Sequence, residues 1–354
     1  MKEKPVIAIT MGDPASIGPE IAVKALLNKK VTTICKPLVI GDASVFKQII
    51  ELLKLNARIH IVHSVAEAKF EDDVIDVFDL ENVNVGELRF GEISAMAGHA
   101  SFEAVKTAIE LALNGEVDAT VTGPINKKSI NEARHHFAGH TEIYAHFTNT
   151  KKYAMLLVEE NLKVIHVSTH VSLRQACDLV KKDRILEVVD LLHKGLQQLG
   201  EKNLKIGIAG LNPHAGDNGL FGTEDDREIK PAVEEARQKG YDVEGPVPPD
   251  TLFSKAATGA YGGVVAMYHD QGHIPFKLNG FKWNAKKQQM ERVKGLNITM
   301  GLPIIRTSVD HGTAFEIAGK GIASADAMIL AIESAVQLTK NKKPSTYRNE
   351  KSFN

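Results

Sequence analysis

Short apolar runs alternate with helical patterns along almost the whole chain, and this alternation constrains the fold more than any other feature. It is typical of α/β proteins, in which helices connect the strands of a mostly parallel sheet. The expected strands are Pro5–Thr10, Leu38–Ile40, Ala119–Thr122, Met155–Val158, Val164–Val167, Ile206–Ala209 and Val264–Met267. The expected helices are Pro19–Leu27, a segment ending at Leu53, Ser101–Leu113, a stretch beginning near Ile143, and Ala325–Leu338.

The size and charge of the chain limit the classes of function. A chain of 354 residues exceeds one typical core, so we expect two domains or one large α/β unit. The formal net charge of −1 creates no general attraction for nucleic acid or membranes, so local basic groups must hold any anionic substrate. Two cysteines exclude a disulfide framework. Without a signal-peptide core or a membrane-spanning apolar run, we expect a cytoplasmic protein.

Three histidines each lie just beyond the end of an apolar strand: His170, His214 and His269. In open α/β sheets, ligands bind outside the carboxyl ends of the strands. Three imidazoles gathered there would bind a divalent cation and leave coordination positions for a substrate. The alternative is that they are ordinary loop histidines. His273 competes for the same role, and His166, inside a strand, is interpreted as structural.

Anion-binding groups are predicted at three further places. Ala138–Glu142 precedes a helical stretch, so its amides and the Thr141 hydroxyl could bind an anion, or Thr141 could simply cap the helix. Lys277 and Arg306 each follow apolar residues and could bind an anion, neutralise a carboxylate or reach solvent. The glycine-rich loop Asp310–Gly321 allows a ligand to approach the backbone closely. It does not match the fingerprint of a conventional Rossmann cofactor site.

Five motifs, in this order, resemble those of the 4-hydroxythreonine-4-phosphate dehydrogenase family. They are Ile9–Pro14, Gly139–Glu142, Asn212–Gly216, Tyr268–Gly272 and Arg306–Ala314, and the resemblance covers roughly residues 5 to 335. Within the family, the chain resembles most the branch that oxidises D-threonate or D-erythronate 4-phosphate. That closer likeness is carried by Lys163–His170, Gly219–Gly222, Pro248–Thr251 and Gln271–Pro275.

The resemblance implies a fold and an assembly. The fold would be a two-domain α/β/α architecture similar to isocitrate and isopropylmalate dehydrogenases, with the active-site cleft between the domains. Residues 1–125 and 303–354 would form the first domain, and residues 126–302 would form the second, with the metal histidines and the dimer interface. The protein would be a homodimer with its active site at the interface.

The resemblance also implies residue roles. His170, His214 and His269 would bind one divalent metal ion (zinc, magnesium, cobalt or manganese), with one histidine supplied across the dimer interface. The substrate would be bound by His140, Thr141, Lys277, Asn297 and Arg306. Asp250 and Asp270 would accept a proton or orient metal ligands. The loop with His311, Gly312 and Thr313 is similar to an adenosine-side cofactor loop, for NAD or alternatively NADP.

Two departures from the family pattern stand out. Ser16 occupies a position where the family usually has glycine, and a left-handed backbone there would strain a serine by roughly 1–2 kcal/mol. The segment from Lys277 to Asn297 is about ten residues longer than the resemblance leads us to expect. Its extra part, Lys282–Arg292, is interpreted either as a lid that adds cations near the phosphate or, preferably, as a solvated helical insert.

The expected reaction is oxidation of the 3-hydroxyl of a 4-phosphorylated hydroxy acid, followed by loss of carbon dioxide. D-threonate or D-erythronate 4-phosphate would yield dihydroxyacetone phosphate in sugar-acid catabolism. 4-Phosphohydroxy-L-threonine would yield 3-amino-2-oxopropyl phosphate in vitamin B6 synthesis. Two alternatives are a metal-dependent phosphohydrolase that uses the same histidines and a non-catalytic sugar-phosphate sensor.

Overall fold

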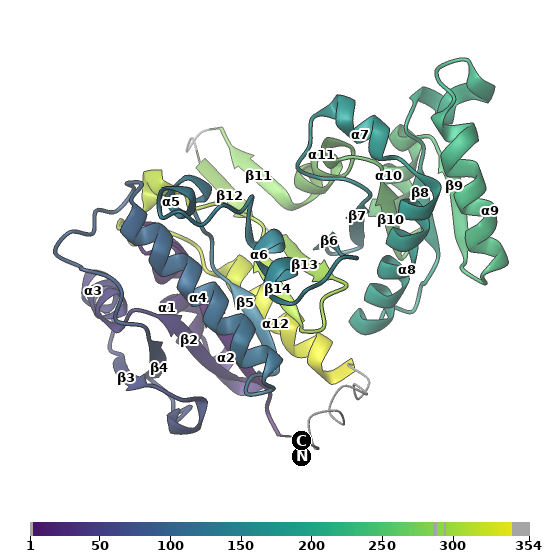
Figure 1. The fold of residues 1–354 in the computed structure, drawn as a ribbon. Coiled ribbons are helices and arrows are strands. Elements are labelled where there is room, and N and C mark those ends of the chain that lie inside the picture. The colour runs from purple at the N-terminus through teal and green to yellow at the C-terminus, as the bar shows by residue number, and fades with distance from the viewer. Residues whose placement is uncertain (1–2, 286–288, 294, 342–354) are drawn as a thin grey trace.

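The fold is built on one long mixed sheet. The computed structural model describes residues 3–285, 289–293 and 295–341, except for the side chains of 283 and 289–293. Twelve strands pair in the order β3-β4-β2-β1-β5-β14-β13-β6-β7-β10-β8-β9, and helices pack along the sheet (Figure 1). The α/β fold class expected from the sequence is therefore confirmed.

The first end of the sheet is entirely parallel. Its strands are β3 (Arg58–Val62), β4 (Val74–Asp79), β2 (Lys36–Gly41), β1 (Val6–Thr10), β5 (Ala119–Thr122) and β14 (Arg306–Val309). The helices of this end are α1 (Gly18–Leu26), α2 (Lys29–Ile34), α3 (Ala43–Leu53), α4 (Ala95–Leu113), α5 (Lys127–Glu132), α6 (His140–Phe147) and α12 (Asp326–Asn341).

Side chains of β1 are buried on both faces of the sheet, because helices cover both. Ile7 and Ile9 belong to a large core that includes residues of α1 and α12. Ala8, which points the other way, packs in a separate cluster with Ala104 and Ala108 of α4. Continuous apolar runs are typical of such doubly covered strands, which is why β1 was predictable.

Strand direction reverses in the middle of the sheet. β13 (Leu296–Met300) is antiparallel to both β14 and β6 (Ala154–Glu159), and β6 is antiparallel to β7. The far end is again parallel, with β7 (Leu162–His166), β10 (Gly263–Ala266), β8 (Ile206–Ala209) and β9 (Val243–Val247). Its helices are α7 (Leu173–Leu179), α8 (Lys182–Leu199), α9 (Lys230–Gln238), α10 (Pro249–Ala257) and α11 (His269–Gly280).

The additional segment after Lys277 is a β-hairpin. β11 (Phe281–Asn284) pairs antiparallel with β12 (Gln289–Val293), separate from the main sheet (Figure 1). The preferred helical interpretation of Lys282–Arg292 was therefore wrong. The backbone register places Phe281 opposite Val293 and Trp283 opposite Met290, with a shift in register between Lys282 and Trp283. The alternative role as a lid stays a prediction.

The loop after β1 accommodates Ser16 without the strain considered above. Ser16 is not among the residues with positive φ. Its hydroxyl donates to the carbonyl of Asp13 at 2.6 Å and accepts from the amide of Gly18 at 2.9 Å. The serine thus supplies hydrogen bonds that a glycine could not make.

The sheet runs without interruption through both expected domains, and their division at 125/126 and 302/303 stays a prediction. Within the described residues, none of the helices combines the length and apolar character that crossing a membrane requires.

Candidate active site

The three strand-end histidines leave the sheet at one edge. β7, β10 and β8 are neighbours and run parallel, so their carboxyl ends lie together. His170 follows β7, His269 begins α11 after β10, and His214 lies in a short 3-10 segment, Pro213–Gly219, after β8. The topology therefore gives these loops a common location, as the position of each histidine along the chain predicted.

His170 and His269 are close enough to share one ion. Their ring centres are 6.0 Å apart, and both side chains are partly exposed, at 41% and 38%. Two imidazoles on one tetrahedral zinc ion have ring centres roughly 5 Å apart, because each zinc–nitrogen bond is about 2.0–2.1 Å. A modest closure would therefore bring both rings onto one ion.

His214 does not join this pair within one chain. Its ring lies 6.3 Å from that of Phe221, and the three histidines do not form a compact ligand group within the described part of the chain. The segment that carries His214 has five consecutive residues in left-handed conformations, His214 to Asn218. A single chain does not test the expected ligand from a second subunit, so the three-histidine centre stays a prediction.

Neighbouring carboxylates orient the two histidines. Asp270 Oδ1 lies 2.6 Å from Nδ1 of His269, and Glu142 Oε1 lies 3.7 Å from Nδ1 of His170. A carboxylate at Nδ1 favours the tautomer whose Nε2 is free to bind a metal. The donor set therefore fits a divalent ion. Sequence reasoning missed Glu142 as a partner, although it lies in the Gly139–Glu142 motif.

Two buried histidines lie beneath the exposed pair. The ring of His273 stacks on that of His269 at 3.7 Å, and the ring of His166 is 4.7 Å from His273. Burial, reinforced by neighbouring histidines, lowers the pKa of His166 to about 3 and that of His273 to about 4. Both rings are therefore neutral at physiological pH and support His269 without adding charge.

The start of α6 lacks a capping side chain. Its N-cap residue is Gly139, which has no side chain that could accept a hydrogen bond from the first amides. The alternative in which Thr141 caps the helix is therefore not observed. Unpaired amides and the positive end of the helix dipole are suited to an anion. The first turn also carries His140, whose pKa is lowered well below its ordinary value by burial and by the charge of Arg306.

Arg306 is a buried cation without an ion-pair partner among the described residues. The side chain, 2% exposed, donates to Thr299 Oγ1 and to Thr122 Oγ1, each at 2.8 Å. Its guanidinium lies 5.5 Å from the centre of the Tyr144 ring. Burial lowers the pKa of Arg306 to about 10. A buried cation that is bonded to neutral groups alone is suited to receiving an anion.

Several buried polar atoms in α6, in β13 and in or just after β14 lack a hydrogen-bond partner among the described residues. They are His140 Nε2, Glu142 Oε2, Asn297 Oδ1, Arg306 Nε and Asp310 Oδ2. Such orphan groups are uncommon because each costs free energy. Three of the five predicted substrate-binding residues, His140, Asn297 and Arg306, are in this set. Lys127, which sequence reasoning missed, adds positive charge that affects both His140 and Glu142.

The predicted cofactor loop begins at the opposite edge of the sheet. β14 runs opposite to β7, so their carboxyl ends point to different edges. In this loop, a Cβ at Gly312 would meet open space, which leaves the backbone accessible to a ligand. The Thr313 carbonyl accepts a hydrogen bond from the amide of Ile17 at 3.2 Å, and His311 Nδ1 contacts the carbonyl of Gly312.

Helix α11 connects the two edges. His269 lies at its first residue and Lys277 near its end, about 12 Å along the axis at the usual helical rise. Burial has the largest effect on Asp310 and raises the pKa of its carboxyl group to about 6. The charge of Lys277 acts on both residues of the loop and lowers the pKa of Asp310 and of His311. Asp250, in the first turn of α10, is exposed, and its carboxylate accepts from the amide of Thr251. No described contact connects Asp250 with the histidine pair.

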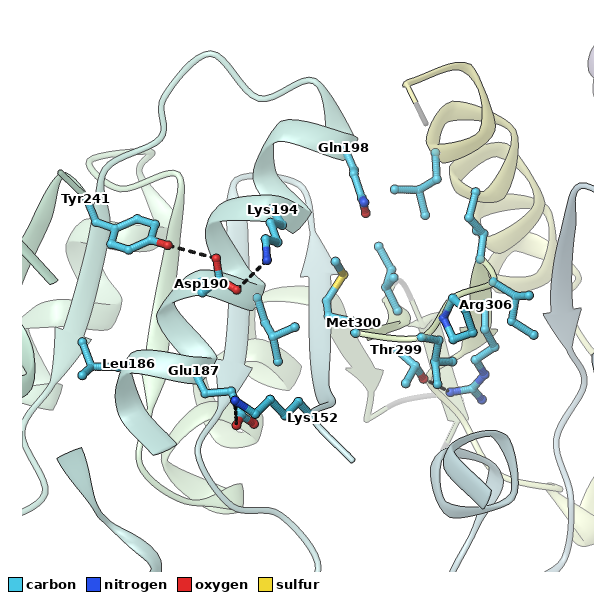
Figure 2. Close-up of a pocket in the computed structure, with 18 of the residues that line it drawn as sticks. Lys152, Leu186, Glu187, Asp190, Lys194, Gln198, Tyr241, Thr299, Met300 and Arg306 are labelled. Atoms are coloured by element: carbon cyan, nitrogen blue, oxygen red, sulfur yellow. Dashed lines mark hydrogen bonds and ion pairs between the residues drawn. The ribbon is translucent and has the colours of Figure 1, made fainter. Parts of the chain in front are cut away.

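Three cavities adjoin these groups. One of about 440 Å³ includes Thr141, Glu142 and His170 in its lining, and one of about 550 Å³ includes His170, His269 and Asp270. A third, of about 680 Å³, lies between α8 and the β13–β14 region, and Arg306 lines it (Figure 2). None of the three strand-end histidines is among its described lining, so we place the histidine part of the candidate site at the first two cavities and the Arg306 part at the third.

The chain matches known proteins over most of its length. Residues 33–335 match a family model described as pyridoxal phosphate biosynthetic protein PdxA. A Fusobacterium nucleatum protein provisionally named D-threonate 4-phosphate dehydrogenase is 43% identical over 95% of this chain and 98% of its own. A Symbiobacterium thermophilum protein with the same provisional name is 44% identical, over 96% of each chain. A solved structure titled 4-hydroxythreonine-4-phosphate dehydrogenase, from Klebsiella pneumoniae, is 44% identical with a TM-score of 0.81, covering 95% of this chain and 100% of that one.

Proposed function

The chain belongs to the PdxA family and is a dehydrogenase, and from this premise we propose that it oxidises and decarboxylates a 4-phosphorylated hydroxy acid. The hydroxyl oxidised is that on carbon 3, and the hydride acceptor is NAD, with NADP as the alternative. D-threonate 4-phosphate is the preferred substrate, because the two curated relatives above carry that provisional name. 4-Phosphohydroxy-L-threonine is the competing substrate, in keeping with the solved structure.

The observation that carries this proposal is the set of unpaired polar groups among the predicted substrate-binding residues. The buried guanidinium of Arg306 and the orphan atoms of His140 and Asn297 favour a polar anionic ligand. We assign these residues, with Thr141 and Lys277, to the phosphate and carboxylate of the substrate. Burial within the protein strengthens such contacts, because water competes less for the same groups.

We propose that His170 and His269 hold the metal together with His214, one of the three being supplied by a second copy of the chain. A bound divalent ion would lower the pKa of the substrate hydroxyl and stabilise negative charge on its oxygen. Asp270 keeps the Nε2 lone pair of His269 available and orients its ring. His273, stacked beneath His269, keeps the ring from turning and remains uncharged.

A nicotinamide cofactor is expected from membership of a dehydrogenase family and would accept the hydride. We propose that its adenosine end lies against the open backbone at Gly312, flanked by His311 and Thr313. The contact between Thr313 and Ile17 anchors this loop to the start of α1. We assign no role to Asp250, because its side chain is exposed and no described contact connects it with the histidine pair.

The test is a set of parallel steady-state assays with three substrates: D-threonate 4-phosphate, D-erythronate 4-phosphate and 4-phosphohydroxy-L-threonine. Each assay contains NAD and one of the candidate metals. We expect NADH formation to require both substrate and metal, with the highest kcat/KM for D-threonate 4-phosphate. Inorganic phosphate is measured in the same samples. Release of phosphate without NADH formation would contradict the proposal.

A further inference from the structure

A second group of potential metal ligands lies outside the site described above. It consists of His99 and Glu103 on α4 and His135, which follows α5. One ligand atom from each of these residues lies within 4.8 Å of the others. In the part of the chain with described side chains, no other group of three histidine, cysteine or acidic residues meets this condition. The proposed reaction uses none of the three residues.

The two imidazoles already have the spacing that one ion requires. His99 Nδ1 lies 3.1 Å from His135 Nε2, and the ring centres are 5.4 Å apart with an interplanar angle of 13°. Two nitrogens on tetrahedral zinc are roughly 3.3 Å apart, given zinc–nitrogen bonds of about 2.0–2.1 Å. An ion could therefore replace the shared proton with shifts of a few tenths of an ångström.

The cluster is held by packing and not by the ligands alone. His99 and Glu103 are one turn apart on α4 and so face the same side of that helix. At the neighbouring Gly98, a Cβ would lie only 2.0 Å from the carbonyl oxygen of Ser129, so α4 and α5 are in direct backbone contact. The ring of His135 stacks on the buried ring of Phe102 at 3.7 Å, which fixes its orientation.

The charge state of the cluster also suits a metal. Burial and the nearby His99 lower the pKa of His135, which favours the neutral ring that can act as a ligand. Glu103 supplies the negative charge. Its competing partner, Lys106, is 3.7 Å away, and both side chains are about one-third exposed, so this ion pair is weak.

We propose that His99, Glu103 and His135 form a second, independent binding site for a divalent ion such as Zn²⁺, for which two imidazoles and a carboxylate are suitable ligands. Water would complete the coordination. The ion would join α4 to the segment between α5 and α6, and that segment leads into the His140–Thr141 turn. The site would therefore stabilise the approach to the substrate-binding helix start without contacting the substrate.

The experiment uses the full chain with His170→Ala and His269→Ala, which removes two ligands of the proposed catalytic metal. After treatment with a chelator, Zn²⁺ binding is measured by competition with a chromogenic zinc indicator, and Co²⁺ binding by its visible absorption. Two further variants add His99→Ala or Glu103→Gln to this background. His63→Ala, which changes an exposed histidine that belongs to neither group, is the matched control.

We expect the background protein and the His63→Ala control to bind one Zn²⁺ per chain with equal affinity. Adding His99→Ala should weaken binding at least about tenfold and remove the tetrahedral Co²⁺ absorption. Substitution of the exposed His99 leaves the Phe102–His135 stack in place, so the circular dichroism spectrum should be unchanged. The proposal is overturned if the background protein binds no zinc, or if His99→Ala and His63→Ala bind it equally. Either result leaves the proposed dehydrogenase function, which is assayed on the parent chain, unaffected.

Discussion

Replacing Arg306 with methionine separates a ligand-binding role from a structural one. Methionine has a similar length but no charge, so it fills most of the same space. A structural arginine paired with a carboxylate would cost about 3–5 kcal/mol of stability when removed, because the buried partner would be left charged. Arg306 has no such partner among the described residues, so we expect a different balance.

The magnitude follows from the surroundings of Arg306. Burial lowers its pKa from an ordinary value of 12.5 to about 10, and at about 1.36 kcal/mol per pKa unit this costs about 3 kcal/mol. The cost is fully present at neutral pH, where the guanidinium is charged in both folded and unfolded chains, and it disappears only above pH 10. The substitution removes this cost of about 3 kcal/mol. That gain offsets the loss of the hydrogen bonds to Thr299 and Thr122, which are worth roughly 1.5 kcal/mol each.

Chemical unfolding of Arg306→Met should therefore give a free energy within about 1 kcal/mol of the parent. In contrast, loss of a charge-assisted contact of roughly 1.5–3 kcal/mol should raise KM for the phosphorylated substrate about 10- to 150-fold. Phosphate should raise the melting temperature of the parent but not of the variant. A variant that loses 3 kcal/mol or more of stability while keeping its KM would refute this reasoning.

Four further predictions concern the metal, one buried acid and the β1 loop. His214→Ala should abolish metal-dependent NADH formation while its elution from gel filtration stays that of the parent; equal turnover by variant and parent would remove its metal role. Asp270→Asn should weaken metal binding about 10- to 100-fold, measured by titration, because the Nδ1 partner of His269 loses its charge. Burial raises the pKa of Asp13 to about 6, above its unfolded value, so the unfolding free energy should fall by up to about 3 kcal/mol between pH 4 and 7. Asp13→Asn should lack that decline, and an identical pH dependence would count against the assignment. Ser16→Gly should lose about 1 kcal/mol in urea unfolding, since its two hydrogen bonds disappear, and a stabilised variant would contradict this.

The sequence predicted best the strands that are buried on both faces. The bounds of β5 and β8 agree with the predicted ones, because their apolar runs end abruptly at turn residues. The sequence did not predict β3, whose residues are mostly partly exposed and lack a clear apolar run. It also missed β13, because its antiparallel pairing depends on β6 and β14, which are distant in sequence.

The start of helix α4 was predicted too late, because the apolar periodicity of its first turns is weak. The helix begins at Ala95, after the Ser94 cap, six residues before the predicted start. Its first turns contain alanine and Gly98, so the apolar period is weak there. Gly98 is required by the contact with α5, and that contact is visible only in three dimensions.

The location of the candidate site followed from one topological rule, but its internal contacts did not. The positions of His170, His214 and His269 after parallel strands were enough to place them at one edge. The contact of Glu142 with His170 and the stack of His273 on His269 depend on side-chain directions that spacing alone does not determine.

The antiparallel strand β13 has a mechanical consequence for catalysis. Because β13 is hydrogen-bonded to β14 on one side and β6 on the other, the two ends of the molecule are joined by a ladder of backbone bonds. A large hinge rotation of one end relative to the other would break these backbone hydrogen bonds, whereas a change in the twist of the sheet would preserve them. We therefore expect the enzyme to enclose its substrate by a small change in the twist of the whole sheet. Larger movements should be confined to the loops at the ends of the strands.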